Sequence, residues 1–230
     1  MNRRAFSFRL AALAASSAAH AESGVPRPSA LNLVTASNRE WNGRNCLAVD
    51  LTDAEQRLRL QTAGGGNRPS FAIVHRDFTD GALEVEIGGE LTGKGAPDDR
   101  GFVGLSFHIS PDLKSHETVY LRMTNGRLNV PPPPEPRIAR AIQYVADPGL
   151  HFSESRERFP GRYEKGADIA VARWHRLRLE IRGPGLRALV DGKEVLVVED
   201  LRFAGRRGPV GLFVGDGSRG LFRELSVRPA

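Results

Sequence analysis

Hydrophobic and polar residues alternate along most of this sequence. Val103, Leu105, Phe107 and Ile109 are separated by Gly104, Ser106 and His108, and the same alternation runs through residues 47–51, 83–87, 119–123 and 177–181. Successive side chains of a strand point to opposite faces of its sheet, so this pattern predicts strands with one face buried against a second layer.

Turn residues separate these strands. The clearest hairpin joins Leu186–Asp191 to Lys193–Val198 through Gly192, and an Asp-Gly pair readily adopts the positive φ angles of a tight turn. No window longer than two helical turns keeps a helical period, and the spacing of Leu58 and Leu60 in residues 53–60 favours a strand. Many short strands with almost no helix predict an all-β sandwich, or jelly roll, of two antiparallel sheets.

The first 21 residues form a predicted signal peptide. Arg3 and Arg4 precede a weakly apolar stretch, and Ala19 and Ala21 supply the small residues that a signal peptidase requires. The pattern fits twin-arginine export and ordinary Sec export equally well. We therefore expect three parts, a signal peptide (1–21), a lead-in with a first strand (22–44) and a single sandwich domain (45–230), and a periplasmic or secreted location.

Composition excludes some classes of function. The formal net charge is +6, but removal of the signal peptide takes away three arginines and leaves 30 basic against 27 acidic residues. No basic block with interleaved aromatics is present, which argues against nucleic-acid binding. The apolar stretch in the signal peptide is too short for a stable membrane span. Cys46 is the only cysteine, so the chain has no internal disulfide and packing must supply its stability.

Five segments carry a resemblance to a known superfamily, and together they extend over nearly the whole mature chain. Residues 78–87 and 101–108 resemble two early strands of concanavalin A-like lectin/glucanase domains, residues 189–194 resemble the Asp-Gly hairpin of laminin-G-like sandwiches, and residues 210–214 and 221–227 resemble the closing strand pair. The sequence is most similar to bacterial exported domains of the keto-disaccharide hydrolase type, which have a fold like that of family 16 glycosidases. The resemblance implies a curved jelly roll with a sugar-facing concave sheet, and a hydrolase or lyase activity. The same fold also serves lectins and adhesion modules.

The acidic strand does not fit the glucanase motif. Family 16 glucanases carry Glu-x-Asp-x-(x)-Glu on a strand, whereas this chain has Glu84, Glu86 and Glu90, with the wrong middle acid and a displaced third acid. We therefore expect these carboxylates to be solvated acids on an outward sheet face.

The polar phase of the strands gives a candidate sugar-binding face. If Val103, Leu105 and Phe107 fill the core, the residues between them point outward. In residues 119–123, Tyr120 and Arg122 likewise point away from the core. Arg, Gln and His bind hydroxyl groups, and Tyr stacks on a sugar ring. The predicted catalytic residues are His108 and Glu164, and the predicted substrate-binding residues are Ser106, Tyr120, Arg122, Asn125, Gln143 and Tyr144.

Metal binding has weaker support in the sequence. The histidines lack the close spacing of helical or ribbon zinc sites, so no metal ligand is assigned. Calcium is a possible cofactor because Asp50, Asp216 and Glu224 could supply oxygen ligands, although no calcium-loop pattern exists. Three functions stay open at this point: a non-catalytic carbohydrate-binding domain, a keto-glycoside hydrolase or lyase, and a structural or adhesion module of the cell envelope.

Overall fold

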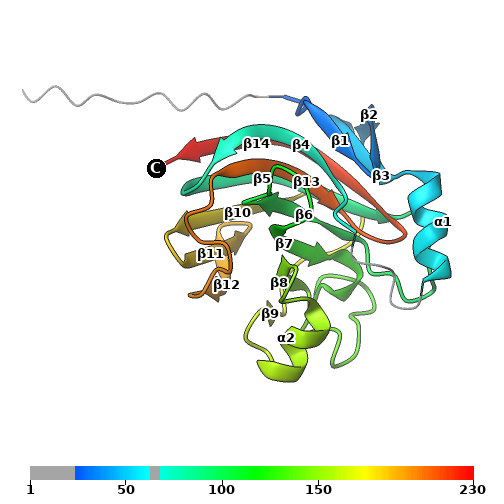
Figure 1. The fold of residues 1–230 in the computed structure, drawn as a ribbon. Coiled ribbons are helices and arrows are strands. Elements are labelled where there is room, and N and C mark those ends of the chain that lie inside the picture. The colour runs from blue at the N-terminus through cyan, green and yellow to red at the C-terminus, as the bar shows by residue number, and fades with distance from the viewer. Residues whose placement is uncertain (1–23, 63–67) are drawn as a thin grey trace, which may run out of the picture.

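Two seven-stranded sheets pack face to face in the computed structural model, which describes residues 24–62 and 68–230 (Figure 1). The predicted signal peptide lies outside the described residues. Every pair of neighbouring strands is antiparallel. The prediction of an all-β sandwich of two antiparallel sheets is therefore confirmed.

Sheet A carries the candidate face. Its strands, in spatial order, are β1 (Ala30–Asn32), β4 (Phe71–Phe78), β13 (Gly208–Val214), β6 (Phe102–Phe107), β7 (His116–Arg122), β8 (Ile142–Asp147) and β9 (Glu164–Lys165). A short 3-10 helix, Met123–Asn125, follows β7.

Sheet B forms the opposite layer. Its strands, in spatial order, are β12 (Lys193–Val198), β11 (Gly185–Val190), β10 (His175–Arg182), β5 (Gly81–Leu91), β14 (Ser218–Pro229), β3 (Arg44–Leu51) and β2 (Val34–Trp41). The predicted hairpin is β11–β12, and Asp191 and Gly192 have φ angles of 50° and 81°. Residues of the predicted lead-in supply β1 to sheet A and β2 to sheet B.

The hydrophobic phase of the strands fills the space between the sheets. Leu105 and Val119 of sheet A, and Val85 and Leu179 of sheet B, are fully buried in one continuous core cluster. Because side chains alternate along each strand, the polar phase of each sheet forms an outer face. The protein thus has two outer faces, one on each sheet.

Helix α1 (Asp53–Gln61) corrects the expectation of a strand over residues 53–60. Thr52 caps the helix, because its hydroxyl accepts a hydrogen bond from the backbone N–H of Glu55 (3.2 Å). The buried face of the helix is polar and consists of Glu55, Gln56 and Arg59, whereas Leu58 and Leu60 are exposed. A helical hydrophobic period is absent because this helix packs through its polar side chains.

A second helix, α2 (Phe152–Arg158), lies between β8 and β9 along the chain. In Figure 1, α1 and α2 project from separate parts of the sandwich, α1 beside β3 and α2 beyond β8 and β9. Neither helix is long and apolar enough to cross a membrane, and the described residues contain no other candidate span.

Candidate functional site

The outer face of sheet A brings together several of the residues that sequence reasoning selected. The strand register places Ser106 opposite Thr118, and Tyr120 opposite Gln143. Arg122 donates hydrogen bonds to the Tyr120 hydroxyl (3.0 Å) and to Oε1 of Gln143 (2.9 Å). Tyr120, Arg122 and Gln143 therefore form one connected polar group on this face.

Two glycines make room for an aromatic floor beside this group. A Cβ atom at Gly104 would lie 2.8 Å from Cβ of Tyr120, and one at Gly215 would lie 2.6 Å from Cβ of Phe102, both too close for a real contact. The absent side chains let the rings of Phe102 and Phe213 approach that of Tyr120, with centroid distances of 5.9 and 5.6 Å. This cluster gives the face an apolar platform.

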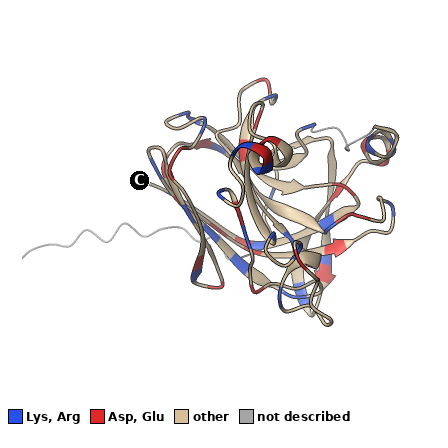
Figure 2. Cartoon of the chain, turned by 90° about the horizontal axis from the view of Figure 1, so that it is seen from below, with Lys and Arg blue, Asp and Glu red and all other residues tan. Residues whose placement is uncertain are grey.

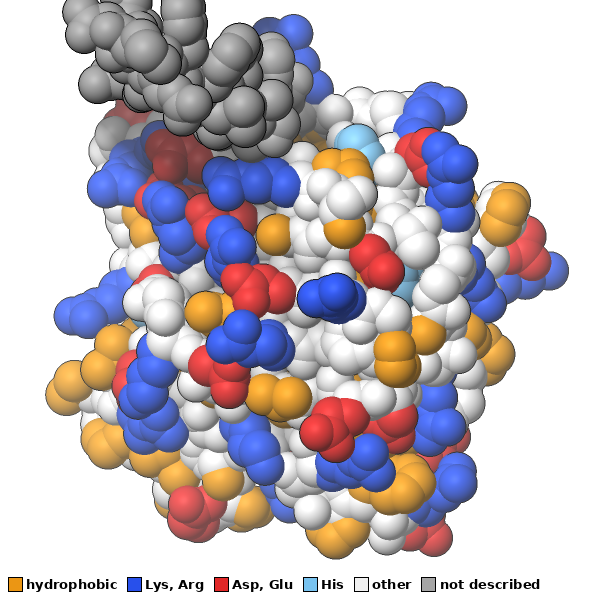
Figure 3. All heavy atoms as spheres, turned by 90° about the vertical axis from the view of Figure 1, so that its left-hand side faces the viewer, with side chains coloured by type: hydrophobic (Ala, Val, Ile, Leu, Met, Phe, Trp, Pro, Cys, Tyr) orange, Lys and Arg blue, Asp and Glu red, His pale blue; other side chains and the backbone are white. Residues whose placement is uncertain are grey.

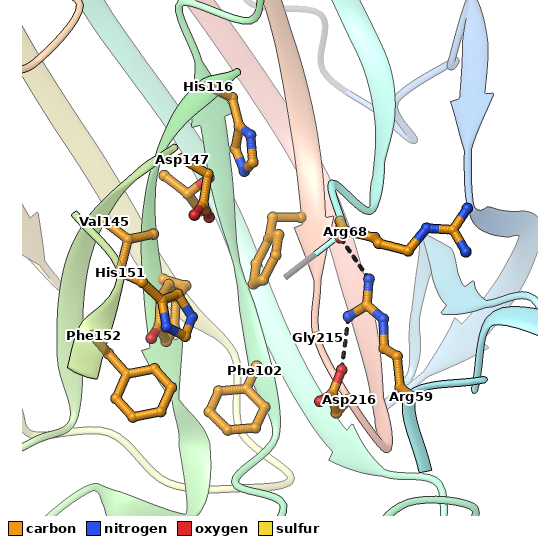
Figure 4. Close-up of a pocket in the computed structure, with 13 residues that line it drawn as sticks. Arg59, Arg68, Phe102, His116, Val145, Asp147, His151, Phe152, Gly215 and Asp216 are labelled. Atoms are coloured by element: carbon orange, nitrogen blue, oxygen red, sulfur yellow. Dashed lines mark hydrogen bonds and ion pairs between the residues drawn. The ribbon is translucent and has the colours of Figure 1, made fainter. Parts of the chain in front are cut away.

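A cavity lies above this aromatic floor, which forms part of its lining (Figure 4). Figure 4 shows Asp147, His151 and Phe152 on one side and Arg59, Arg68 and Asp216 on the other. The open space between the walls is about 620 Å³, its solvent-facing part included. The lining residues are Arg59, Arg68, Phe102, His116, Thr118, Tyr120, Val145, Asp147, His151, Phe152, Phe213, Gly215 and Asp216.

Arg59 of α1 holds one wall in place. Its guanidinium group donates to Oε1 of Glu55 (2.8 Å), to Oδ1 of Asp216 (2.7 Å) and to the backbone carbonyl of Arg68 (2.6 Å). The polar buried face of α1 thus fixes the turn between β13 and β14 against the cavity.

His116 and Asp147 are neighbours on the other wall, since they occupy paired positions of β7 and β8. His116 is almost fully buried, and its Nδ1 has no hydrogen-bond partner among the described residues. Burial, with a smaller contribution from Glu154, raises the pKa of Asp147 to about 6. Burial lowers the pKa of His116 to about 4, against the opposing effect of Glu117.

Within residues 24–62 and 68–230 neither of these side chains forms an ion pair, so burial rather than pairing shifts its pKa. Near pH 6 the carboxyl group of Asp147 can give or accept a proton, while the imidazole of His116 is neutral and can accept one. Burial also lowers the pKa of His151, which lies on the same wall, to about 4. Shifted titratable groups that meet in a cavity are typical of sites for binding or proton transfer.

Glu164 lies beside the cavity but is fixed by arginines. Its carboxylate accepts hydrogen bonds from Arg156 (2.8 and 2.9 Å) and Arg122 (3.4 Å) and forms an ion pair with Arg140 (3.2 Å). The structure therefore connects Glu164 to the Tyr120–Arg122–Gln143 group as an acceptor that is already engaged. Its predicted catalytic role stays a prediction.

His108 does not lie on the outer face, contrary to the sequence analysis. It has a φ of 49°, which ends the alternation of β6, and it is fully buried. Its Nδ1 lies 2.6 Å from Oε2 of Glu117, and its Nε2 lies 2.8 Å from the carbonyl oxygen of Thr79. Both ring nitrogens are thus engaged within the protein, which gives no geometric support to the predicted catalytic role of His108.

The other predicted binding residues also have internal partners. Tyr144 belongs to the core phase of β8 and donates to Oε1 of Glu117 (2.5 Å). The hydroxyl of Ser106 pairs with that of Thr118 (2.7 Å), and the side-chain amide of Asn125 donates to the carbonyl oxygen of Arg140 (3.0 Å). Of the predicted site residues, Tyr120 is the one that lines the cavity.

Sequence reasoning missed the titratable residues of the cavity, although a signal for two of them exists. His116 has the same strand phase as Tyr120, and Asp147 has the same phase as Gln143. Extending the alternation by four residues, from Tyr120 back to His116 and from Gln143 on to Asp147, would have selected both. Arg59 carries no such signal, because it reaches the cavity from a helix whose spacing resembles a strand.

The candidate calcium ligands do not meet. Asp50 pairs with Arg219 (2.9 Å), Asp216 with Arg59 (2.7 Å) and Glu224 with Arg223 (2.7 Å). Over residues 24–62 and 68–230, no group of three or more His, Cys, Asp or Glu side chains could hold a metal ion.

Comparisons with known proteins identify the fold. No family model matches the sequence, and no curated protein matches it significantly. The carbohydrate binding module CBM66 from Bacillus subtilis is similar in structure, with a TM-score of 0.51, 13% identity, and coverage of 85% of this chain and 94% of that chain.

Two further solved structures are more distant. A Bacillus subtilis protein of unknown function with a galectin-like fold has a TM-score of 0.47 at 10% identity, covering 84% of this chain and 86% of that one. A β-1,3-1,4-glucanase (lichenase) from a mouse hindgut metagenome has a TM-score of 0.44 at 10% identity, covering 86% of this chain and 78% of that one. The chain has the concanavalin A-like jelly-roll fold, and at these identities the likeness concerns the fold alone.

Proposed function

We propose that the protein binds a carbohydrate in the cavity on the outer face of sheet A. The observation that carries this proposal is the combination of an aromatic floor (Phe102, Tyr120, Phe213) with polar walls. On one wall, Nδ1 of His116 has no hydrogen-bond partner among the described residues, and Asp147 lies beside it. Sugar rings present apolar C–H faces for stacking and hydroxyl groups at their edges for hydrogen bonding, which matches this arrangement.

The structural neighbour supports the same proposal. CBM66 is named as a carbohydrate binding module, and the two chains match over most of their lengths. Export to the periplasm or the medium, which we infer from residues 1–21, would bring the cavity into contact with environmental or cell-envelope glycans.

A glycan array followed by calorimetric titration tests the proposal. The Phe213→Ala variant should weaken binding about tenfold, because it removes one ring of the floor. Phe203→Ala is a matched control, since Phe203 is a partly buried phenylalanine that does not line the cavity. If no neutral or charged glycan binds, or if both variants bind equally well, the proposal is wrong and a structural or adhesion role is favoured.

The pair His116–Asp147 favours a second candidate function, cleavage of a keto-glycoside. The imidazole of His116 would take the proton from the carbon beside the carbonyl group, and the C–H electron pair would form a C=C bond. The C–O bond to the departing sugar would break toward oxygen, which would receive the proton of Asp147. Incubation of the protein with a keto-glycoside, followed by analysis for released sugars, tests this reaction. The Asp147→Asn variant should release no sugar but still bind the glycan detectably.

A further inference from the structure

The cleft continues beyond the cavity described above. A second compartment shares Arg59, Phe102, Phe152 and Asp216 with the first and adds about 750 Å³ of open space, its solvent-facing part included. Its additional lining residues come from α1, from the residue that caps its C-terminus and from the loop between β5 and β6. They are Gln56, Leu60, Thr62, Ala96, Asp98 and Asp99. The rings of Phe102 and Phe152 therefore border both compartments.

Hydrogen bonds hold the walls of the second compartment in place. Oε1 of Gln56 accepts a hydrogen bond from the backbone N–H of Gly217 (2.9 Å), and the backbone N–H of Thr92 donates to the carbonyl oxygen of the same glycine (2.8 Å). One turn thus ties α1 to the β5–β6 loop. A ligand that enters this compartment meets walls that are already ordered, which lowers the entropic cost of binding.

Two buried polar atoms of this compartment lack a partner. Gln56 is 6% exposed, and its Nε2 has no hydrogen-bond partner among the residues that the structure describes. Oδ2 of Asp99 also lacks a partner among these residues, but it faces the backbone of two glycines, since a Cβ atom at Gly95 or Gly217 would lie 1.6 or 1.9 Å from it. The free donor of this compartment is therefore the amide of Gln56, and a hydroxyl group can accept its hydrogen bond.

The charge of the compartment restricts its ligand. Asp98, Asp99 and Asp216 line it. Arg59, the one basic lining residue within the part of the chain that the structure describes, already binds Glu55 and Asp216. Burial raises the pKa of Asp99 to about 6, and repulsion from the nearby carboxylate of Asp216 adds to this effect. A ligand with a carboxylate or sulfate group would be repelled.

We propose that this compartment is a second subsite, which binds an uncharged sugar residue of an oligosaccharide whose neighbouring residue occupies the first cavity. The inference rests on the proposed function and adds to it that the ligand is a neutral oligosaccharide of at least two residues. Phe102 and Phe152 then contact both residues.

Titration with ligands of increasing length tests this subsite. The probes are gluco-, galacto-, manno-, xylo- and fructo-oligosaccharides of one to four residues, together with trigalacturonate. We expect the series that binds to gain about tenfold in affinity from one residue to two or three, and trigalacturonate not to bind. Asp98→Arg should remove this gain and leave the affinity for the monosaccharide unchanged, because Asp98 is exposed and borders only the second compartment.

Glu40→Arg is the matched control, because Glu40 is exposed on β2 and lines neither compartment. Affinity that does not depend on chain length, equal gains in the Asp98→Arg and wild-type proteins, or tight binding of trigalacturonate would overturn the inference while the proposed function stands. Failure of every series to bind contradicts the proposed function, and the second subsite with it.

Discussion

The two outer faces of the sandwich use charge in opposite ways. On sheet B, arginines and glutamates pair across neighbouring strands, as in Arg178–Glu84 (3.2 Å), Arg176–Glu86 (3.3 Å) and Arg187–Glu180 (3.1 Å). Figure 3 shows basic and acidic side chains interleaved on the side that carries β10, β11 and β12 in Figure 1, and Figure 2 shows both signs distributed over the ribbon. On sheet A, aromatic rings line a cavity together with the titratable groups of His116 and Asp147, and Nδ1 of His116 has no hydrogen-bond partner among the described residues.

The difference shows how one sequence pattern serves two purposes. Both faces arise from the polar residues of alternating strands. On sheet B these residues pair as arginine–glutamate ion pairs, whereas the sheet A face combines the paired Glu164 with His116 and Asp147, which form no ion pair with another described residue. The raised pKa of Asp147 means that its ionised form costs stability, which is typical of a residue retained for a ligand or a reaction. Three variants test this contrast.

Asp147→Asn should give the largest change in stability. Because the pKa of Asp147 is raised to about 6 from 3.8, the carboxylate destabilises the folded state, fully above pH 6 and progressively less as the pH falls toward 4. The variant should therefore be more stable than the wild type by about 3 kcal/mol at pH 8 and nearly unchanged at pH 4. Urea unfolding at both pH values measures this, with the exposed Glu135→Gln as control. An equal effect at both pH values would show that Asp147 does not carry this cost.

Phe102→Ala should give the next largest effect. Phe102 borders both compartments, so its loss should weaken binding of short and long oligosaccharides alike by about tenfold in calorimetric titrations. Arg176→Ala on the outer face of sheet B is the control and should leave affinity unchanged. A comparable loss in both variants would contradict the assignment of binding to sheet A.

Glu84→Gln should give the smallest effect. Glu84 pairs with Arg176 and Arg178, and all three side chains are partly exposed, so the loss should be below about 1 kcal/mol in unfolding free energy. Because salt screens such pairs, the difference from the wild type should shrink further in 1 M sodium chloride. A loss above about 2 kcal/mol that salt does not change would mean that the network on sheet B is structurally essential.

The sequence predicted the sheets better than the site. Alternation located the strands and grouped Tyr120, Arg122 and Gln143, since strand phase decides which way a side chain points. The phase argument fails at His108, where a positive φ turns the side chain away from the face expected for it. The pattern of hydrophobic and polar residues does not reveal such a local change of backbone conformation.

The far wall of the cleft was beyond prediction for a different reason. Arg59 and Gln56 lie on a helix whose buried face is polar, so hydrophobic spacing gives no sign of it. The sequence suggests Asp216 only as a calcium ligand. In the structure it binds Arg59, which lies 157 positions earlier in the chain. Contacts between a helix and a distant turn depend on the assembled fold.

The glycines beneath the aromatic floor have a consequence for tracing this site through divergent sequences. At Gly104 a Cβ atom would lie 2.2 Å from the carbonyl oxygen of Val119, so the position accepts no side chain at all. Polar residues that bind the ligand can be replaced when the ligand specificity of a protein changes. A side chain at the position of Gly104, by contrast, would push the neighbouring strand away. Glycine at the position of Gly104, on the strand beside Tyr120, is therefore the mark by which other chains that carry the same cavity can be identified.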